Sequence, residues 1–271
     1  MEDRGPAAYV AEFLGTLILV FAIGMVLSVH PSAAGLDSLD FAVIGLVHVF
    51  VLAMLIHSLG GTSGAHFNPA VTAVMVVMKK IRAGQAAVYV ALQLVGALAG
   101  ALLVKMLLDD EGDAVGYGAV GVSDFLSGSA SLGFLAEAIG TFLLVFAIFG
   151  AAVNPRSEAS WAPWIIGGTL GMAVMLFGPL TGAGFNPARA FGPAVVGNVF
   201  GSLGDWLLAF VLGPVVGAVA AGVTYTKLVL EPQERLFGGR LVDADVPPGR
   251  VPGEVEATVQ APGERPVDKL S

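Results

Sequence analysis

The chain has 271 residues, of which 56% are hydrophobic and 13% are charged, and its net charge is −8. This composition lies far from that of soluble domains and indicates an integral membrane protein. The negative charge disfavours nucleic acid as a partner. The lack of cysteine excludes disulfides, thiolate nucleophiles and thiolate metal sites within this chain, and we expect no metal and no cofactor.

Six long apolar runs follow one another along the chain, each close to the roughly 20 residues that a membrane-spanning helix needs. Their nearly continuous apolarity, without alternation of polar and apolar residues, disfavours a transmembrane β-barrel. The sequence therefore predicts an all-α polytopic membrane protein. The expected spans are about 7–29, 39–59, 85–108, 132–153, 163–180 and 206–230.

The tripeptide Asn-Pro-Ala occurs twice between these spans. Proline suits the first turn of a helix, and an asparagine before it can cap that helix. The apolar segments that follow, 70–78 and 188–196, would be roughly 13 Å long, whereas the hydrocarbon core of a bilayer is about 30 Å thick. They are therefore predicted to be half-helices that enter the membrane without crossing it. The two copies are Asn68, Pro69 and Ala70, and Asn186, Pro187 and Ala188.

An internal repeat relates the two halves of the chain. Three expected spans separate equivalent points of the two copies, and because three is an odd number the second copy is inverted in the membrane. The half-helices then enter from opposite faces, so Asn68 and Asn186 are expected to meet near the midplane. The matching segments are EFLGTLILVF (12–21) with EAIGTFLLVF (137–146), and SGAHFNPAVT (63–72) with TGAGFNPARA (181–190).

Basic residues outside the spans fall on one side of the predicted membrane. By the positive-inside rule this side is cytoplasmic, so we expect both termini in the cytoplasm. We expect the membrane to be the plasma membrane. Lys105 is the one basic residue near a span end on the other side. The residues on the cytoplasmic side are Arg4, Lys79, Lys80, Arg82, Arg156, Lys227, Arg235 and Arg240.

The chain divides into three parts. Residues 1–6 are a short cytoplasmic segment, and residues 7–230 form a channel domain with inverted repeats at about 7–110 and 131–230. From residue 231 to residue 271 the composition shifts to charge, proline and glycine, with too few large apolar side chains to form a core. We expect this tail to be disordered and cytoplasmic.

The meeting point of the half-helices has a distinctive electrostatic character. Each helix N-terminus carries unpaired N–H groups and about half a positive charge. Two such ends with two asparagine amides would repel cations and would orient a passing water through its oxygen. Arg189 directly follows the second motif, and a charge at membrane depth is so costly that it marks a functional site. These features predict a pore.

At these residues the chain resembles the major intrinsic protein family, the aquaporins and glycerol facilitators. The resemblance covers roughly residues 7–230 and includes the Glu-x-x-Gly-Thr signature at Glu12 and Glu137, the segment SGAHFNPAVT, and the arginine after the second motif. It implies an aquaporin-like fold of six tilted transmembrane helices and two re-entrant half-helices. It also implies a pore within each protomer of a homotetramer in the lipid bilayer.

The resemblance further implies a selectivity filter of four residues, which correspond here to His48, Val174, Ala183 and Arg189. Family members that pass only water usually have phenylalanine, histidine and a small residue beside the arginine, and glycerol facilitators usually have tryptophan, glycine and phenylalanine. In this chain the histidine lies on the second span and a valine on the fifth, which resembles the branch found in plant vacuolar membranes. We expect a wider and less polar filter than in strict water channels.

Other residues take their expected roles from the same resemblance. His66 is expected to line the cytoplasmic approach to the motifs. Glu12 and Glu137 could form a proton relay, but their equivalent places favour a structural role as buried acceptors for N–H groups of the loops. Ala190 follows the arginine where the glycerol branch usually has aspartate, which favours water.

We therefore expect a passive channel for water and small neutral solutes such as ammonia, urea, hydrogen peroxide or glycerol, with ions and protons excluded. A glycerol or urea facilitator that passes water secondarily is the alternative. A coupled secondary transporter is less favoured, because it would need titratable or ion-coordinating groups at the midplane. No catalytic constellation or phosphate-binding loop is apparent in the sequence, so an enzyme is not expected.

Overall fold

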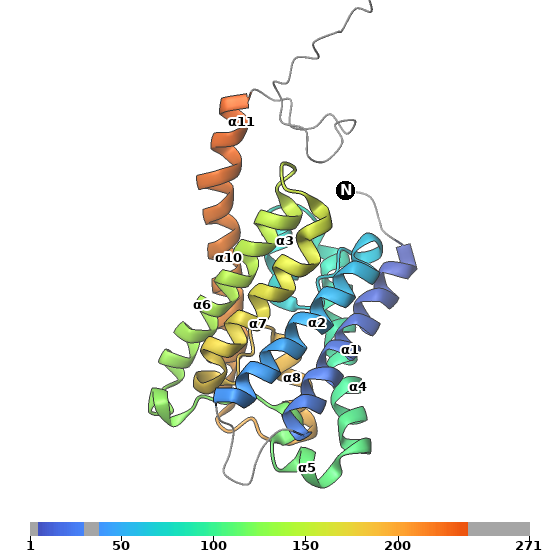
Figure 1. Cartoon of the computed structure of the whole chain (residues 1–271), viewed down its shortest axis with the longest axis vertical. Coiled ribbons are helices and arrows are strands. Elements are labelled where there is room, and N and C mark those ends of the chain that lie inside the picture. The colour runs from blue at the N-terminus through green and yellow to red at the C-terminus, as the bar shows by residue number, and fades with distance from the viewer. Residues whose placement is uncertain (1–4, 30–37, 238–271) are drawn as a thin grey trace, which may run out of the picture.

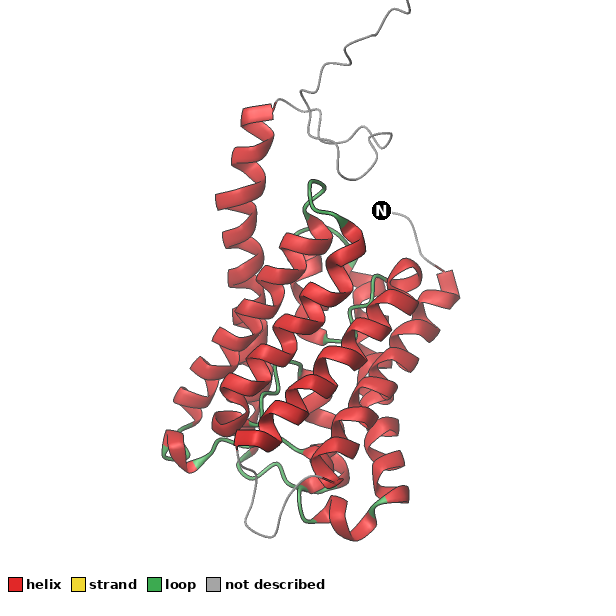
Figure 2. Ribbon diagram, in the orientation of Figure 1, coloured by secondary structure: helices red, strands yellow, loops and turns green. Residues whose placement is uncertain are grey.

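The computed structural model describes residues 5–29 and 38–237. Within these residues the chain is helical, without β-strands, and six helices are long and apolar enough to cross a membrane (Figure 1, Figure 2). The predicted all-α fold is confirmed. The spans are α1 (Gly5–Val29), α2 (Ser38–Ser63), α4 (Ala83–Leu107), α6 (Ala130–Ile148), α7 (Ala162–Thr181) and the series α9 (Leu203–Leu207), η5 (Leu208–Leu212), α10 (Gly213–Tyr225), η6 (Thr226–Leu230) and α11 (Glu231–Phe237).

Two short helices lie among the spans. They are α3 (Pro69–Val77) and α8 (Pro187–Val196), with 9 and 10 residues. In Figure 1, α3 lies toward the end of the bundle that carries α11, and α8 toward the end that carries α5 (Asp109–Asp113). The start of α1 lies at the same end as α11. The half-helices therefore enter from opposite ends, as the inverted repeat predicts.

The helices pair in a way that repeats the duplication. In the first half α1 packs on α4 and α2, and in the second half α6 packs on α10 and α7. An extensive contact between α2 and α7 joins the halves. The segment between α4 and α6 adds α5 and a 3₁₀ turn, η1 (Gly116–Gly118), both of which pack on α1.

Glycines allow these helices to approach closely. A Cβ added at Gly167 would lie 2.6 Å from the carbonyl oxygen of Val49, and one added at Gly171 would lie 2.6 Å from the carbonyl oxygen of Gly45. Val49 and Gly45 both belong to α2. Such distances are too short for real Cβ atoms, so the α2–α7 contact requires glycine. Two other pairs spaced by four residues likewise face the backbone of a partner helix. They are Gly96 and Gly100, which face α1, and Gly213 and Gly217, which face α6.

The C-terminal boundary differs from the expectation. Residue 231 was expected to begin a disordered tail, but the helix continues through α11 to Phe237. Lys227 Nζ donates to Glu231 Oε1 at 2.6 Å, one turn apart, and such a pair favours helix across the predicted boundary. Most of the expected N-terminal segment (residues 1–4) and the rest of the tail (residues 238–271) lie outside the described residues.

Replacing Gly167 by leucine tests the close contact of α2 and α7. The new side chain would overlap the α2 backbone, so Gly167→Leu is expected to destabilise the protein by about 1–3 kcal/mol or more. Gly168→Leu is the matched control, because among the described residues no heavy atom lies within 4 Å of a Cβ added there. Thermal unfolding in detergent would measure both variants, and equal losses would contradict the assignment.

Candidate functional site

The two Asn-Pro-Ala motifs begin α3 and α8 by the same capping geometry. Asn68 Oδ1 accepts a hydrogen bond from Ala70 N at 2.8 Å, and Asn186 Oδ1 accepts one from Ala188 N at 3.0 Å. Both asparagines are in the extended region, and a proline follows each as the first helical residue. The side-chain cap leaves the amide nitrogen of each asparagine available for a different partner.

That amide nitrogen binds the other half of the chain. Asn68 Nδ2 donates to the Phe185 carbonyl oxygen at 2.8 Å, and Asn186 Nδ2 donates to the Phe67 carbonyl oxygen at 2.8 Å. The asparagines are 4% and 6% exposed. The reciprocal bonds hold the two helix N-termini together in the interior, which confirms the predicted meeting of Asn68 and Asn186.

Glu12 holds the loop that leads into α3. Its Oε1 accepts from Ser63 Oγ at 2.6 Å and His66 N at 2.9 Å, and its Oε2 accepts from Phe67 N at 2.7 Å and Gln93 Nε2 at 2.7 Å. The side chain is fully buried. Four donors thus satisfy one carboxylate where no solvent can do so.

Glu137 does the same for the loop before α8. Its Oε1 accepts from Thr181 Oγ1 at 2.6 Å and Gly184 N at 2.8 Å, and its Oε2 accepts from Phe185 N at 2.5 Å. This side chain is also fully buried. The two carboxylates occupy equivalent places in the repeats, and their bonds fit the expectation that they support the loops rather than relay protons.

The sequence analysis did not single out the phenylalanine before each motif. Phe67 and Phe185 are completely buried, and each has a left-handed backbone, with φ values of 48° and 49°. An added Cβ at Gly15 would overlap the Phe67 ring, and one at Gly140 would overlap the Phe185 ring. In each Glu-x-x-Gly-Thr signature the glutamate therefore binds the phenylalanine N–H and the glycine makes room for its ring. The repeated Phe-Asn-Pro-Ala sequence was the available signal.

Two cavities meet at the predicted filter. One, of about 80 Å³, is lined by both motif asparagines, and the other has about 110 Å³. His48 and Arg189 line both cavities, whereas Ala183 lines only the first and Val174 only the second. The four residues come from α2, α7, α8 and the loop before α8, and the structure brings them together where the cavities join.

The hydrogen bonds at the filter determine what it offers to a solute. His48 Nδ1 lies 2.8 Å from the Ile44 carbonyl oxygen, which can only accept, so this nitrogen carries the proton and Nε2 of the neutral ring is an acceptor. His48 Nε2 has no partner among the described residues. Arg189 Nη1 donates to the Gly118 carbonyl oxygen at 2.7 Å. The filter thus combines an acceptor with the remaining donors of a guanidinium.

His66 lines the first cavity together with both motif asparagines. Its Nδ1 lies 3.1 Å from Thr72 Oγ1, which itself donates to the Asn68 carbonyl oxygen at 3.0 Å. Because the threonine proton is used in that bond, His66 Nδ1 must be the donor. Its ring packs edge-on against Tyr89, with centroids 5.4 Å apart. These contacts hold His66 where the loop approaches α3.

Sequence reasoning missed two other groups, Gln93 and Gly118. Gln93 Nε2 bridges Glu12 Oε2 and Thr72 Oγ1, and Gly118 supplies the carbonyl that binds Arg189. Neither lies in the recognised motifs, and both act through contacts between segments distant in sequence. In the described part of the chain, no group of three or more His, Asp or Glu side chains could hold a metal ion.

Replacing Glu12 tests its supporting role. Glu12→Leu would leave four donors buried without an acceptor, at a cost of about 1–3 kcal/mol for each one that stays unpaired. We expect a lower unfolding temperature and a lower yield of folded protein. Glu158→Leu, at an exposed carboxylate, is the control. A well-folded Glu12→Leu protein whose transport changes only in its pH dependence would instead support a proton relay.

Comparison with known proteins agrees with this geometry. The model of a family described as Major intrinsic protein matches residues 5–225. Aquaporin AqpM of Methanothermobacter marburgensis is 36% identical over 239 residues, covering 82% of this chain and 97% of that protein. The glycerol uptake facilitator protein-like 6 of Lactiplantibacillus plantarum is 36% identical over 215 residues, covering 79% and 94%.

A solved structure shares the fold. The aquaglyceroporin from Plasmodium falciparum superposes with a TM-score of 0.72 at 23% identity, covering 85% of this chain and 98% of that one. At this identity the likeness concerns the fold alone. Together with the match of the family model over most of the sequence, it leads to one conclusion: the chain is a multi-pass membrane protein that belongs to the major intrinsic protein family.

Proposed function

We propose that this protein is a passive channel for water and small neutral solutes that excludes ions and protons. The observation that carries the proposal is the meeting of two capped helix N-termini in a buried passage, joined by the reciprocal bonds of Asn68 and Asn186. Relatives named as an aquaporin and as a glycerol uptake facilitator support it. The protein is a channel and not an enzyme.

Exclusion of cations and protons follows from the donors at the midplane. One N–H of each asparagine amide donates to the opposite loop, which leaves the second N–H for a permeating molecule. A water that accepts both through its oxygen directs its own hydrogens outward, so a chain of identically oriented waters is interrupted. The two helix N-termini add positive potential that repels cations. The cavity that contains the two asparagines is also lined by apolar residues such as Leu52, Val71 and Ile166. These side chains offer an ion no polar groups to replace the water molecules of its hydration shell.

The filter sets which neutral molecules pass. His48 offers an acceptor and Arg189 offers donors, so a small polar solute can exchange hydrogen bonds with both as it leaves water. Val174 and Ala183 supply the remaining wall with small side chains, which supports passage of solutes larger than water. The residue after the arginine, Ala190, favours water over glycerol by family resemblance. Water is thus the main permeant, with urea, ammonia, hydrogen peroxide or glycerol passing as well.

Two other functions can be weighed against this one. A glycerol or urea facilitator is the nearer alternative, and the valine at position 174 together with the glycerol facilitator relative favours it. A coupled transporter is less well supported, because the midplane presents two neutral amides. The buried carboxylates of Glu12 and Glu137 already accept hydrogen bonds from the loops.

The setting of the channel is also a proposal. Residues 7–230 form the channel domain, the last helix continues through Glu231–Phe237, and we place the residues from 231 onward on the cytoplasmic side. Lys79 and Lys80 follow α3, and α3 lies toward the end of the bundle where α1 starts, which supports a cytoplasmic location for both termini by the positive-inside rule. We also place the protein in the plasma membrane, and the family resemblance supports a homotetramer.

Stopped-flow light scattering on proteoliposomes tests the proposal. Water permeability is expected well above that of empty vesicles, with measurable urea and glycerol entry and no proton flux under a pH gradient. Water permeability equal to that of empty vesicles would contradict the main proposal. Complete exclusion of urea and glycerol would contradict the wide filter, and accumulation against a gradient would indicate a transporter.

A larger side chain at Val174 tests the filter assignment. Val174→Phe places a ring at the junction of the cavities, so urea and glycerol permeability is expected to fall by roughly tenfold while water falls less. Met172→Phe is the matched control, because Met172 lies on the same helix and is 45% exposed on the outside. If both variants lower permeability equally, Val174 does not line the narrow part of the passage.

A further inference from the structure

The filter arginine depends on a contact outside the motifs. Among the described residues, the Gly118 carbonyl at 2.7 Å is the one hydrogen-bond partner of the Arg189 guanidinium, and Arg189 Nε has none. Arg189 lines both cavities. The position of this side chain, and with it the width of the filter, therefore depends on how firmly the Gly118 carbonyl is held.

The backbone that presents this carbonyl has an unusual conformation. Gly116, Tyr117 and Gly118 have φ values of 56°, 55° and 88°, so three successive residues are left-handed. Two are glycines, but Tyr117 has a side chain that disfavours this region. Such a backbone persists only where its surroundings hold it in place. The turn lies against α1, where a Cβ added at Gly24 would be 3.0 Å from the Tyr117 carbonyl oxygen.

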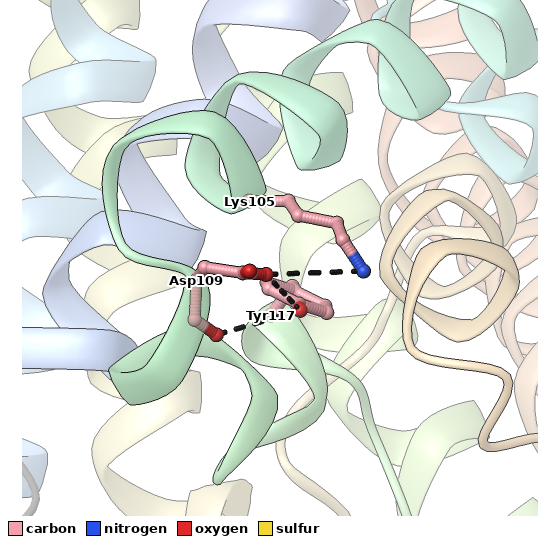
Figure 3. A network of polar contacts seen from close by, with 3 residues as sticks. All are labelled: Lys105, Asp109 and Tyr117. Carbon is pink, nitrogen blue, oxygen red and sulfur yellow. Dashed lines mark hydrogen bonds and ion pairs between the residues drawn. The ribbon is translucent and has the colours of Figure 1, made fainter.

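A polar cluster at the C-terminal end of α4 anchors Tyr117 (Figure 3). Tyr117 Oη donates to Asp109 Oδ1 at 3.1 Å, and Lys105 Nζ lies 3.9 Å from that oxygen and 5.1 Å from the centroid of the tyrosine ring. The ring is 1% exposed and lies against Gly112, where an added Cβ would be 2.5 Å from it. The Tyr117 side chain is thus fixed by its contacts with Asp109, Lys105 and Gly112.

We infer that Tyr117, anchored by Asp109, is a positioning residue that holds Arg189 through the Gly118 carbonyl and so sets the selectivity of the filter. This inference rests on the proposed function. Tyr117 touches no solute, since it lines neither cavity. Without the hydrogen bond between Tyr117 and Asp109, the turn at Gly116–Gly118 is less constrained and the Gly118 carbonyl holds the Arg189 guanidinium less firmly. The filter, which Arg189 narrows, then admits larger solutes.

The measurement is the ratio of urea or glycerol permeability to water permeability in proteoliposomes. Tyr117→Phe keeps the ring but removes the hydroxyl, and the ratio is expected to rise about two- to tenfold, the effect of losing one hydrogen bond on an equilibrium constant. Simple loss of folded protein would lower all permeabilities together and leave the ratio unchanged. Tyr225→Phe is the matched control, because that buried hydroxyl accepts a hydrogen bond from Asn154 away from both cavities.

A second pair of variants tests the anchor at an exposed position. Asp109 is 73% exposed, so its replacement spares the core. Asp109→Ala removes the side-chain acceptor at 3.1 Å and leaves only the Asp109 carbonyl oxygen at 3.5 Å, so it is expected to raise the ratio. Asp109→Asn keeps a side-chain oxygen for the tyrosine and should restore most of the original ratio. An unchanged or lowered ratio in both Tyr117→Phe and Asp109→Ala would overturn the inference.

A double substitution shows whether Tyr117 acts through the arginine. In a protein that already carries Arg189→Ala, adding Tyr117→Phe is expected to leave the ratio unchanged. A further change of the same size as in the parent protein would overturn the inference. Failure of the proposed function is distinguishable, because the unsubstituted protein would then conduct no more water than empty vesicles.

Discussion

Two buried carboxylates make the interior of this protein possible. A chain that leaves the helical conformation inside a bilayer exposes N–H groups that no water can satisfy. Glu12 and Glu137 accept these N–H groups directly, together with the hydroxyl of the last residue of the preceding helix, Ser63 of α2 and Thr181 of α7. Because each loop is held in this way, each half-helix can begin in the interior of the bundle rather than at its end.

The functional properties then follow from where the half-helices begin. Their first residues carry the positive ends of two dipoles and two amides with a free N–H, all directed to one place. The same supports bring Arg189 beside His48 at the junction of the cavities. In the proposed function, ion exclusion and solute choice therefore lie in adjacent parts of one passage, the first at the motifs and the second at the side chains that surround Arg189.

The sequence alone predicted those parts of the structure that arise from local signals. Apolar length predicted the spans and proline after asparagine predicted the half-helices, because each of these signals lies within a short segment. The repeat predicted the inversion because its matching segments can be compared directly in the sequence. The Gly118–Arg189 bond and the Tyr117 anchor were not predictable in this way, since they depend on how segments distant in sequence approach one another. The extension of the last helix to Phe237 was missed because composition averaged over the whole tail concealed a short helical stretch.

The reciprocal bonds between the repeats also constrain how the protein folds. The asparagine of each repeat binds a carbonyl 117 or 119 residues away, so neither half contains its own partner. Such long-range contacts form late, after the entropy of closing a long loop has been overcome. During synthesis the first half therefore has to hold an unpaired amide and an unpaired carbonyl until the second half is inserted. The passage therefore cannot be completed before both halves are present, although its sequence motifs are the easiest to recognise.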